Sequence, residues 1–265
     1  DAAYQSGCIG LHVGIESGNP EILKKIRKPG TVETFIETSE ILKKFPKINT
    51  RALLMIGFPN ETLGQIFDTI KLAETINFDW NNLAILQPWK GTPIYDEMSE
   101  DGLLGKEEGT LKTEDNEKAP YQLGTYSRQR SIETGKISKV FDEKIFDGFL
   151  NRITIKDMNS LPNTKDLDDI WFYMNFRINF SRLLRENRPA KIDQQYSFLN
   201  YVHRKTAPDN ALIIYFFAYL EFRKKGKVSQ ELINKFNSRI QNSEYWMERT
   251  KSLGLTRNHL EKNTF

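Results

Sequence analysis

The stretch TRALLMIGFPNE, from Thr50 to Glu61, decides the fold that this sequence predicts. It is an apolar run that ends in the turn Gly57-Phe58-Pro59-Asn60 and passes directly into an amphipathic helical pattern. A short apolar run bounded by Gly and Pro is typical of a buried strand. We therefore predict a central β-strand whose carboxyl end forms a tight turn in front of a helix.

Two similar segments flank this central strand. CIGLHVGIESG ends in Glu16-Ser17-Gly18, LAILQPWKG contains Gln87-Pro88 near its end, and helical patterns separate the three segments. This alternation predicts a βαβαβ unit with a parallel sheet. Ligands of such sheets bind at the carboxyl ends of the strands. We therefore expect Glu16-Ser17-Gly18, Gly57-Phe58-Pro59 and Gln87-Pro88 to line one site.

The first strand alternates between two kinds of residue. The face predicted to pack under the helices carries Ile9, Leu11, Val13 and Ile15, and the face predicted to point into a barrel-like interior carries Gly10, His12, Gly14 and Glu16. Glu16 would then lie at the open end of that interior, although a hydrogen bond to a neighbouring turn would explain it equally well.

The segment Asp1–Ser6 shows no helix or strand pattern, and an all-parallel sheet would leave an open edge. We expect the chain to be the later part of a longer protein, or to pair this edge with another chain.

Several helix boundaries are marked by capping residues. Asn19-Pro20-Glu21 predicts a helix that ends at Lys28-Pro29-Gly30, and Thr31 predicts the start of the next helix. Asn60 or Thr62 is expected to cap the helix after the central strand, whose free first-turn amides would point at the site. The third strand is predicted over Asn82–Gln87.

The basic cluster Lys24, Lys25, Arg27 and Lys28 is expected to be a solvated face, from which Arg27 or Lys28 could reach a carboxylate ligand.

The second half of the chain has a different pattern. Residues 105–120 are polar and predict a linker. This divides the chain into predicted regions 1–104, 105–120 and 121–265, the last of them α-helical. Its aromatic residues are expected to form a core between packed helices rather than a ligand platform. The predicted helices are Asp166–Asn187, Gln194–Arg204, Asp209–Lys225, Ser229–Gln241 and a last helix with Tyr245 and Trp246.

Composition narrows the class of protein. The net charge of +3 is small for 265 residues, which makes nucleic acid an unlikely partner. The apolar run from Ala211 to Phe222 contains Glu221 and is too short to span a bilayer. A single cysteine excludes an internal disulfide framework. We predict a cytoplasmic protein with no membrane segment.

Three motifs in order resemble a known family: GIESGNPEILKKIRKPGTVE, RALLMIGFPNET and DWNNLAILQPWKGTPIYDEM. Together, over about Cys8–Met98, they resemble the second half of a radical S-adenosylmethionine (SAM) domain, most closely in the cobalamin-binding subgroup and its methylthiotransferase relatives. Any (β/α) barrel could carry one such turn, but three in order are far more specific. The resemblance implies an α/β fold, a partial (β/α) barrel of strands four to six, followed by the α-helical region.

The resemblance also implies a SAM site at the strand ends. Its residues would be Glu16, Ser17 and Gly18 for the ribose and amino-acid part, Ile56, Gly57, Phe58 and Glu61 for the adenine, Lys28 or Arg27 for the SAM carboxylate, and Gln87 and Pro88 for the pocket edge. Asn60 stands where the family usually has a small residue, and Asn tolerates the same left-handed turn geometry.

One departure from the family limits what this chain can do alone. The family binds a [4Fe–4S] cluster through a CxxxCxxC loop, and such clusters need cysteine ligands. This sequence has only Cys8, which is expected to be a small buried residue. The cluster ligands are therefore not in this chain, which has no predicted catalytic or metal-binding residue and should be inactive by itself.

Two hypotheses from different classes follow. In the first, the chain is part of a radical SAM oxidoreductase or transferase that forms a 5'-deoxyadenosyl radical and acts on a small-molecule substrate. The missing N-terminal half would carry the cluster, any cobalamin would bind there too, and a homodimer through the open edge is a further option. In the second, the chain is a non-catalytic half-barrel and helical assembly module. An RNA-modifying methylthiotransferase ranks lower, because the tail is helical and the charge is near neutral.

Overall fold

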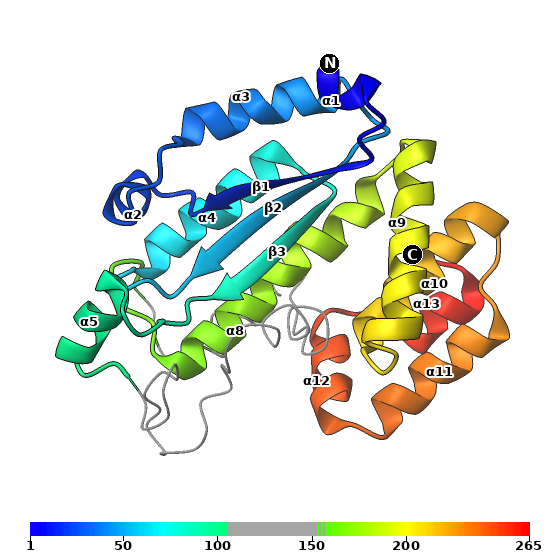
Figure 1. Ribbon diagram of the computed structural model, residues 1–265. Helices are drawn as coiled ribbons and strands as arrows, with labels where there is room; N and C mark the ends of the chain where they lie inside the picture. Colours follow the sequence, from blue (N-terminus) through cyan, green and yellow to red (C-terminus); the bar gives the residue numbers. More distant parts are fainter. Residues whose placement is uncertain (105–152, 154, 156) are drawn as a thin grey trace.

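The computed structural model describes residues 1–104, 153, 155 and 157–265, so the predicted linker at 105–120 lies outside the described residues. Among the described residues, β1 (Gly10–Glu16), β2 (Asn49–Ile56) and β3 (Trp80–Ile85) form one sheet in the order β1-β2-β3 (Figure 1). Both pairings are parallel. The predicted βαβαβ unit is confirmed, and β3 begins and ends two residues earlier than predicted.

A β-bulge interrupts the end of β1. The pairing runs in step from Gly10 with Asn49 to Gly14 with Leu53, and Glu16 then pairs with Leu54, so that Ile15 is an extra residue. Glu16 has a positive φ of 68°. A bulge bends its strand and changes the direction of the following side chain. The strict alternation predicted for this strand is therefore wrong at its last two residues.

The residues before β1 also differ from the prediction. A short helix α1 (Ala2–Gln5) precedes the strand, where no helix was expected. Ile9 lies outside β1 and is 83% exposed, so its predicted packing under the helices is wrong. The backbone carbonyl of Ile9 still accepts a hydrogen bond from Asn49 N, but the Ile9 side chain lies outside the core.

The predicted capping residues are confirmed. Asn19 Oδ1 accepts hydrogen bonds from the first turn of α2 (Pro20–Lys25), and Thr31 forms a capping box with Thr34 at α3 (Val32–Lys43). Thr62, rather than Asn60, caps α4 (Leu63–Ile76). Helix α2 ends three residues earlier than predicted, where Arg27 takes a positive φ of 56°. Helix α5 (Pro93–Glu100) follows β3.

The two faces of the sheet are covered differently. Figure 1 shows α3 and α4 on one side of the sheet and α8 (Thr164–Asn175) along β3. In β2, the residues of one face are buried, namely Thr50, Ala52, Leu54 and Ile56. On the other face Arg51, Leu53 and Met55 are only half-buried. The register places Gly14 and Asn82 beside Leu53, so this half-exposed face crosses all three strands.

The predicted helix Asp166–Asn187 is a continuous helical run of three forms. After α8 come a π-helix, η1 (Phe176–Phe180), and a 3-10 helix, η2 (Ser181–Arg185). Its aromatic residues, which include Trp171 and Phe180, are buried as predicted. The aliphatic residue Leu184 near its end is 41% exposed. Asn179, whose side chain contacts β3, lies in this π-helix.

The remaining helices agree with the prediction in type and differ in their bounds. They are α9 (Pro189–Tyr201), the π-helix η3 (Val202–Thr206), α10 (Ala211–Lys225), α11 (Gln230–Gln241), α12 (Glu244–Ser252) and α13 (Arg257–Lys262). Pro189 begins α9 five residues before its predicted start, as Pro often does at a first helical position. Helix α13 was not predicted. Within the described ranges, no helix has both the length and the apolar character that a membrane span requires.

Side chains of the helical run close the free edge of β3. Asn179 Oδ1 accepts a hydrogen bond from Asn81 N at 2.7 Å, and Asn179 Nδ2 donates to Asn81 O at 2.9 Å. Trp171 Nε1 donates to Leu83 O at 3.0 Å. These groups satisfy backbone atoms that a fourth strand would otherwise pair. Within the described part of the chain, no strand pairs with the outer side of β1.

A buried ion network joins the sheet to the helical region. Asp79 Oδ2 accepts hydrogen bonds from Thr50 N at 2.8 Å and Thr50 Oγ1 at 2.9 Å. Lys191 of α9 donates to the same oxygen at 2.7 Å and to Ile48 O at 2.8 Å. Arg182 donates to Asp79 O at 2.9 Å. The side chains of Asp79 and Lys191 are 2% and 4% exposed, so neither charge is shared with solvent.

We expect Lys191→Met to lower the free energy of unfolding by about 3 kcal/mol, because removing one partner of a buried pair leaves the other charge uncompensated. Urea unfolding at neutral pH measures this loss. The matched control is Lys224→Met, which breaks the more exposed pair with Asp193 and should cost under about 1 kcal/mol. Equal losses in the two variants would contradict the role given to Lys191.

Candidate functional site

The loops that follow the three parallel strands lie at the same end of the sheet. We call this end, formed by residues 16–18, 57–61 and 86–88, the carboxyl edge. Leu86 N donates to Ile56 O at 2.8 Å and holds two of the loops together. Gly57 has a φ of 82°, and a Cβ there would lie 3.2 Å from Leu167 and 3.3 Å from Ile85. A side chain at position 57 would therefore be strained as well as crowded.

Glu61 fixes the turn that follows β2. Its Oε2 accepts hydrogen bonds from Gly57 N at 2.6 Å and Phe58 N at 3.1 Å, and its own N–H donates to Phe58 O at 2.9 Å. Asn60 takes the left-handed conformation, with a φ of 59°, as the sequence predicted. The predicted closure of this turn by Glu61 is thus present in the structure.

The Glu61 carboxyl group is also an unusual one. It is 2% exposed, and its Oε1 has no hydrogen-bond partner among the described residues. Burial raises the pKa of Glu61 to about 7, although the N–H groups of Phe58 and Gly57 act in the opposite direction. The turn therefore contains an acid that titrates near neutral pH.

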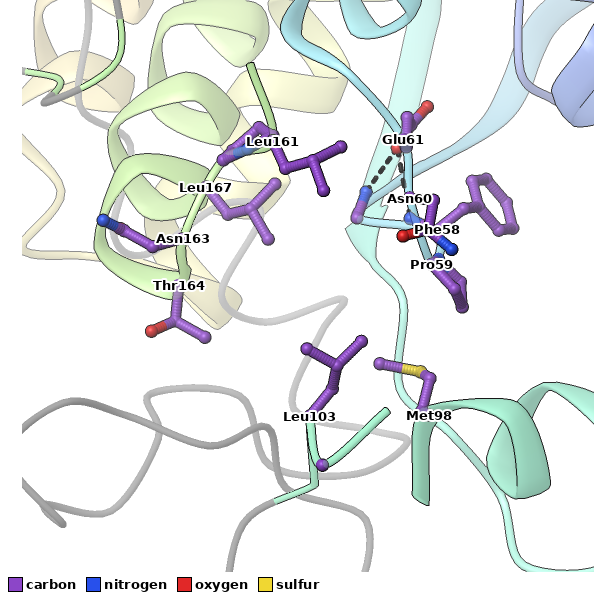
Figure 2. Close-up of a pocket in the computed structure, with 13 residues that line it drawn as sticks. Phe58, Pro59, Asn60, Glu61, Met98, Leu103, Leu161, Asn163, Thr164 and Leu167 are labelled. Atoms are coloured by element: carbon purple, nitrogen blue, oxygen red, sulfur yellow. Dashed lines mark hydrogen bonds between the residues drawn. The ribbon is translucent and has the colours of Figure 1, made fainter. Parts of the chain in front are cut away.

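A pocket of about 300 Å³ opens beside this turn. Figure 2 shows Phe58, Pro59 and Asn60 on one side of it and Leu161 and Leu167 on the other, with Met98 and Leu103 below. Its lining is mainly apolar, with the backbone of the turn and the start of α8 as polar groups. Such a pocket suits a flat, largely apolar ligand with a few polar edges.

The amino end of α4 is not available to a ligand as predicted. Leu63 N donates to Ser160 O at 3.0 Å, and Gly64 N donates to Met158 O at 2.8 Å. Gln65 N is bonded to Thr62 Oγ1. The prediction of free first-turn amides is therefore wrong, because a segment from the helical region already satisfies them. A distant loop like this one leaves no signal near α4 in the sequence.

Glu16 and Lys28 form an ion pair at the end of β1. Lys28 Nζ lies 3.0 Å from Glu16 Oε1, and both side chains are 25% exposed. A Cβ at Gly14 would lie 3.0 Å from that Nζ and 3.1 Å from that oxygen, so a residue without a side chain gives the pair its space. Of the two basic candidates, Lys28 is therefore the one that faces Glu16.

Ser17 and Gly18 lie in a different environment from Glu16. Ser17 is fully buried, its Oγ lies 3.2 Å from Thr69 Oγ1, and it accepts a hydrogen bond from Asn19 N. A Cβ at Gly18 would lie 2.4 Å from Asp68 O, so this glycine permits close contact with α4. In this structure both residues join β1 to α4, and their predicted contact with SAM stays a prediction.

The other predicted residues lie at or near the carboxyl edge. Ile56 is buried at the end of β2, Gln87 is half-buried after β3, and Pro88 is buried beside it. The wall formed by Leu161 and Leu167 was not predicted, because these residues follow β2 by about a hundred positions in the sequence.

Lys25, which was expected to lie on a solvated face, has a structural role that was not predicted. Its Nζ donates to Pro59 O at 3.0 Å and pairs with Glu97 at 2.5 Å. It thus ties α2 and α5 to the turn.

The residues of this chain do not fit an iron–sulfur cluster. The sequence contains one cysteine, and the described residues include no group of three or more His, Cys, Asp and Glu side chains that could hold a metal ion. Cys8 is half-buried rather than buried as predicted, and its Sγ contacts Gly10 O at 3.3 Å. A cluster of this kind requires several thiolates, so its ligands would have to come from outside these residues.

Comparison with known proteins places the first part of the chain. Residues 2–73 match the family model of the radical SAM superfamily. A stretch of 103 residues is 33% identical to an uncharacterized methyltransferase of Pyrococcus horikoshii and covers 39% of this chain and 22% of that protein. The match of residues 2–73 to the radical SAM superfamily thus agrees with the resemblance that the motifs indicated.

Two further relatives are enzymes named tRNA-2-methylthio-N(6)-dimethylallyladenosine synthase. The one from Halalkalibacterium halodurans is 37% identical over 84 residues, which cover 31% of this chain and 16% of that protein. The one from Thermotoga petrophila is 36% identical over 83 residues, which cover 31% and 19%. The chain thus matches about a fifth of the length of these relatives. None of the three names mentions cobalamin, and the cobalamin subgroup stays a prediction.

The raised pKa of Glu61 makes the stability of the carboxyl edge depend on pH. Because the pKa rises on folding, from 4.5 to about 7, the folded chain binds the proton more tightly. The stabilisation is complete below pH 4.5 and is lost as the pH rises to about 7, a total of about 3 kcal/mol.

We therefore expect wild-type protein to lose stability relative to Glu61→Gln between pH 4.5 and 7, because the amide keeps an acceptor for the two N–H groups and does not titrate. Urea unfolding of both proteins at several pH values in this range measures the difference. Parallel curves for the two proteins would show that Glu61 ionises normally.

Proposed function

We propose that residues 1–104 hold the adenosine side of SAM in a radical SAM enzyme. The observation that carries this proposal is the apolar pocket beside the Glu61-locked turn, at the carboxyl edge of a segment that matches the superfamily. The adenine would lie between the turn and the wall of Leu161 and Leu167. Ile56, Gly57 and Phe58 would supply backbone contacts, and Gln87 and Pro88 would form the rim.

The Glu16–Lys28 pair supports a place for the amino-acid end of SAM. That end carries one ammonium and one carboxylate group. The pair offers one charge of each sign, and both of its side chains are 25% exposed. Lys28 would bind the carboxylate, and Glu16 would accept a hydrogen bond from the ammonium or the ribose. The exchange of one ion pair for two charge-assisted contacts avoids leaving a buried charge unpaired.

The chemistry that the family implies is divided between this chain and other polypeptide. In the family, the [4Fe–4S] cluster supplies the electron for the reductive cleavage of SAM. Since these residues do not fit a cluster, we assign its ligands to polypeptide outside this sequence. The contribution of this chain would be to bind the adenosyl group and to exclude water from it.

The open edge of β1 is the natural place for that polypeptide. The sheet is paired on one side of β1 only, and its half-exposed face carries Gly14, Leu53 and Asn82. We propose that further parallel strands, which carry the cluster ligands, pair with β1 and complete a (β/α) barrel. A second copy of this chain would compete for the same edge, and this is the form that a homodimer would take.

One relative is named as an uncharacterized methyltransferase and the others as tRNA-2-methylthio-N(6)-dimethylallyladenosine synthases, which favours a transferase for the whole protein. The matched stretches are 103 and 84 residues long and cover 22% and 16% of those proteins, so we do not extend the tRNA substrate to this chain. The non-catalytic assembly module remains the second candidate, and the single cysteine is the observation that favours it.

We expect the chain to bind SAM, and Lys28→Gln to weaken that binding about tenfold, because a charge-assisted hydrogen bond to the carboxylate is lost. Isothermal titration with SAM measures both affinities. Lys24→Gln is the matched control, since Lys24 is an exposed lysine of α2, four residues before Lys28. Its affinity should equal that of the wild type.

The two candidate functions give different results in this titration. An assembly module without a SAM site would show no saturable heat in any of the proteins. SAM binding that is equal in Lys28→Gln and Lys24→Gln would leave the adenosine pocket in place and contradict the site proposed for the amino-acid end.

A further inference from the structure

A second cavity lies between α4, η1, η2 and the start of α9. It measures about 580 Å³, and we call it the arginine cavity. Its lining includes Arg177, Arg182, Arg185 and Arg188 together with two carboxylates, Glu74 and Glu186. Asn77 and Asn187 add amide groups. The lining thus carries two more positive than negative charges. Four arginine side chains around one space are unusual in a molecule whose charges are otherwise nearly balanced.

Each of the two carboxylates in the lining is bound by arginines of the same cavity. Glu74 binds Arg177 with two hydrogen bonds, at 2.6 and 3.0 Å. Glu186 is shared, because Arg188 donates to it at 2.8 and 2.6 Å and Arg182 donates at 3.4 Å. Burial raises the pKa of Glu186, but hydrogen bonds from Arg188 and the charges of Arg188 and Arg182 outweigh it and lower the pKa overall. Arg182 and Arg188 therefore share one ionised carboxylate, that of Glu186.

Three of the guanidinium groups are held in fixed positions. Arg177 Nη1 also donates to Tyr173 OH at 2.6 Å. Arg182 is 7% exposed and donates to Asn77 Oδ1 and Asp79 O. Arg188 is held by both oxygens of Glu186. Each guanidinium has five N–H groups, so these contacts leave donors on every one of them. A set of oriented donors needs little reorganisation to bind an anion.

The end of α4 explains only part of this cluster. The C-terminus of a helix attracts positive charge. At the C-terminus of α4 this charge is Arg182, which donates hydrogen bonds to Asn77 Oδ1 and Asp79 O. Asp79 lies 3.9 Å from Arg182 and 2.7 Å from Lys191, so the charge of Lys191 balances its charge and the excess over the lining does not change. Neither contact accounts for Arg185 and Arg188, which are exposed at the mouth of the same cavity.

We propose that the arginine cavity is a binding site for a phosphate monoester or a free phosphate ion. A phosphate dianion would offset the excess of two positive charges, and guanidinium groups match its oxygens in a bidentate manner. The volume leaves room for a small organic group on the phosphate. Because Asn77 and Asp79 precede β3, the cavity lies at the amino end of the sheet, opposite the carboxyl edge. The site is therefore separate from the SAM site proposed above and does not depend on it.

Binding of inorganic phosphate to the whole chain, at constant ionic strength, tests this site. We expect saturable binding by isothermal titration, and about tenfold weaker binding in Arg185→Gln and in Arg188→Gln, because each loses a charge-assisted contact. Arg204→Gln is the matched control, an exposed arginine of η3 that does not line the cavity, and it should bind as the wild type does. Circular dichroism confirms that each variant is folded. If Arg188→Gln fails to fold, Arg185→Gln decides the test.

Two further measurements complete the test. A nucleoside monophosphate that binds more tightly than inorganic phosphate, while the nucleoside alone does not bind, indicates a phosphate monoester; equal affinities indicate the free ion. Phosphate affinity should not change in saturating SAM. Absence of saturable binding, equal binding by Arg185→Gln and wild type, or competition between phosphate and SAM would each overturn the proposal.

Discussion

The buried carboxylate of Asp79 is the contact on which the arrangement of this molecule depends. It fixes the start of β3 to Thr50 of β2 and holds Lys191 of α9 in a space that excludes water. Burying two charges is costly, and only short hydrogen bonds to several partners offset the loss of hydration. Thr50 and Ile48 O supply those partners from the start of β2, and Arg182 adds a hydrogen bond to Asp79 O from the helical run. The ion network therefore requires the sheet and the helical region to pack together in one way.

The consequence of this packing is a sheet with two different edges. The helical run lies along β3, where Asn179 and Trp171 satisfy backbone groups that would otherwise attract another strand. The π-helix is what brings Asn179 to this place, and irregular turns of this kind often serve such specific contacts. No comparable helix covers the outer side of β1 in the described part of the chain. Among the described residues, the outer edge of β1 is thus left without a neighbouring strand.

The sequence predicted the local features well, because these depend on neighbouring residues. The parallel strands, the caps at Asn19, Thr31 and Thr62, and the turn closed by Glu61 all follow from patterns of a few residues. What it could not predict depends on contacts between distant segments. The bonds from α4 to Met158 O and Ser160 O and the wall formed by Leu167 are of that kind. The bulge at Ile15 was missed because period-two alternation contains no signal for an extra residue.

The two cavities differ in chemistry because they lie at opposite ends of the same strands. At the carboxyl edge, backbone turns and apolar side chains surround a small pocket in which the one buried acid, Glu61, is bonded to the backbone. At the amino end, long side chains from three helical segments converge around the end of α4 and carry an excess of positive charge. A nucleoside suits the first environment and a phosphate group suits the second. Arg182 bonds to Asp79 O just before β3, and Gln87 and Pro88 follow the other end of the same strand, so the two cavities lie at opposite ends of β3 and share no lining residue.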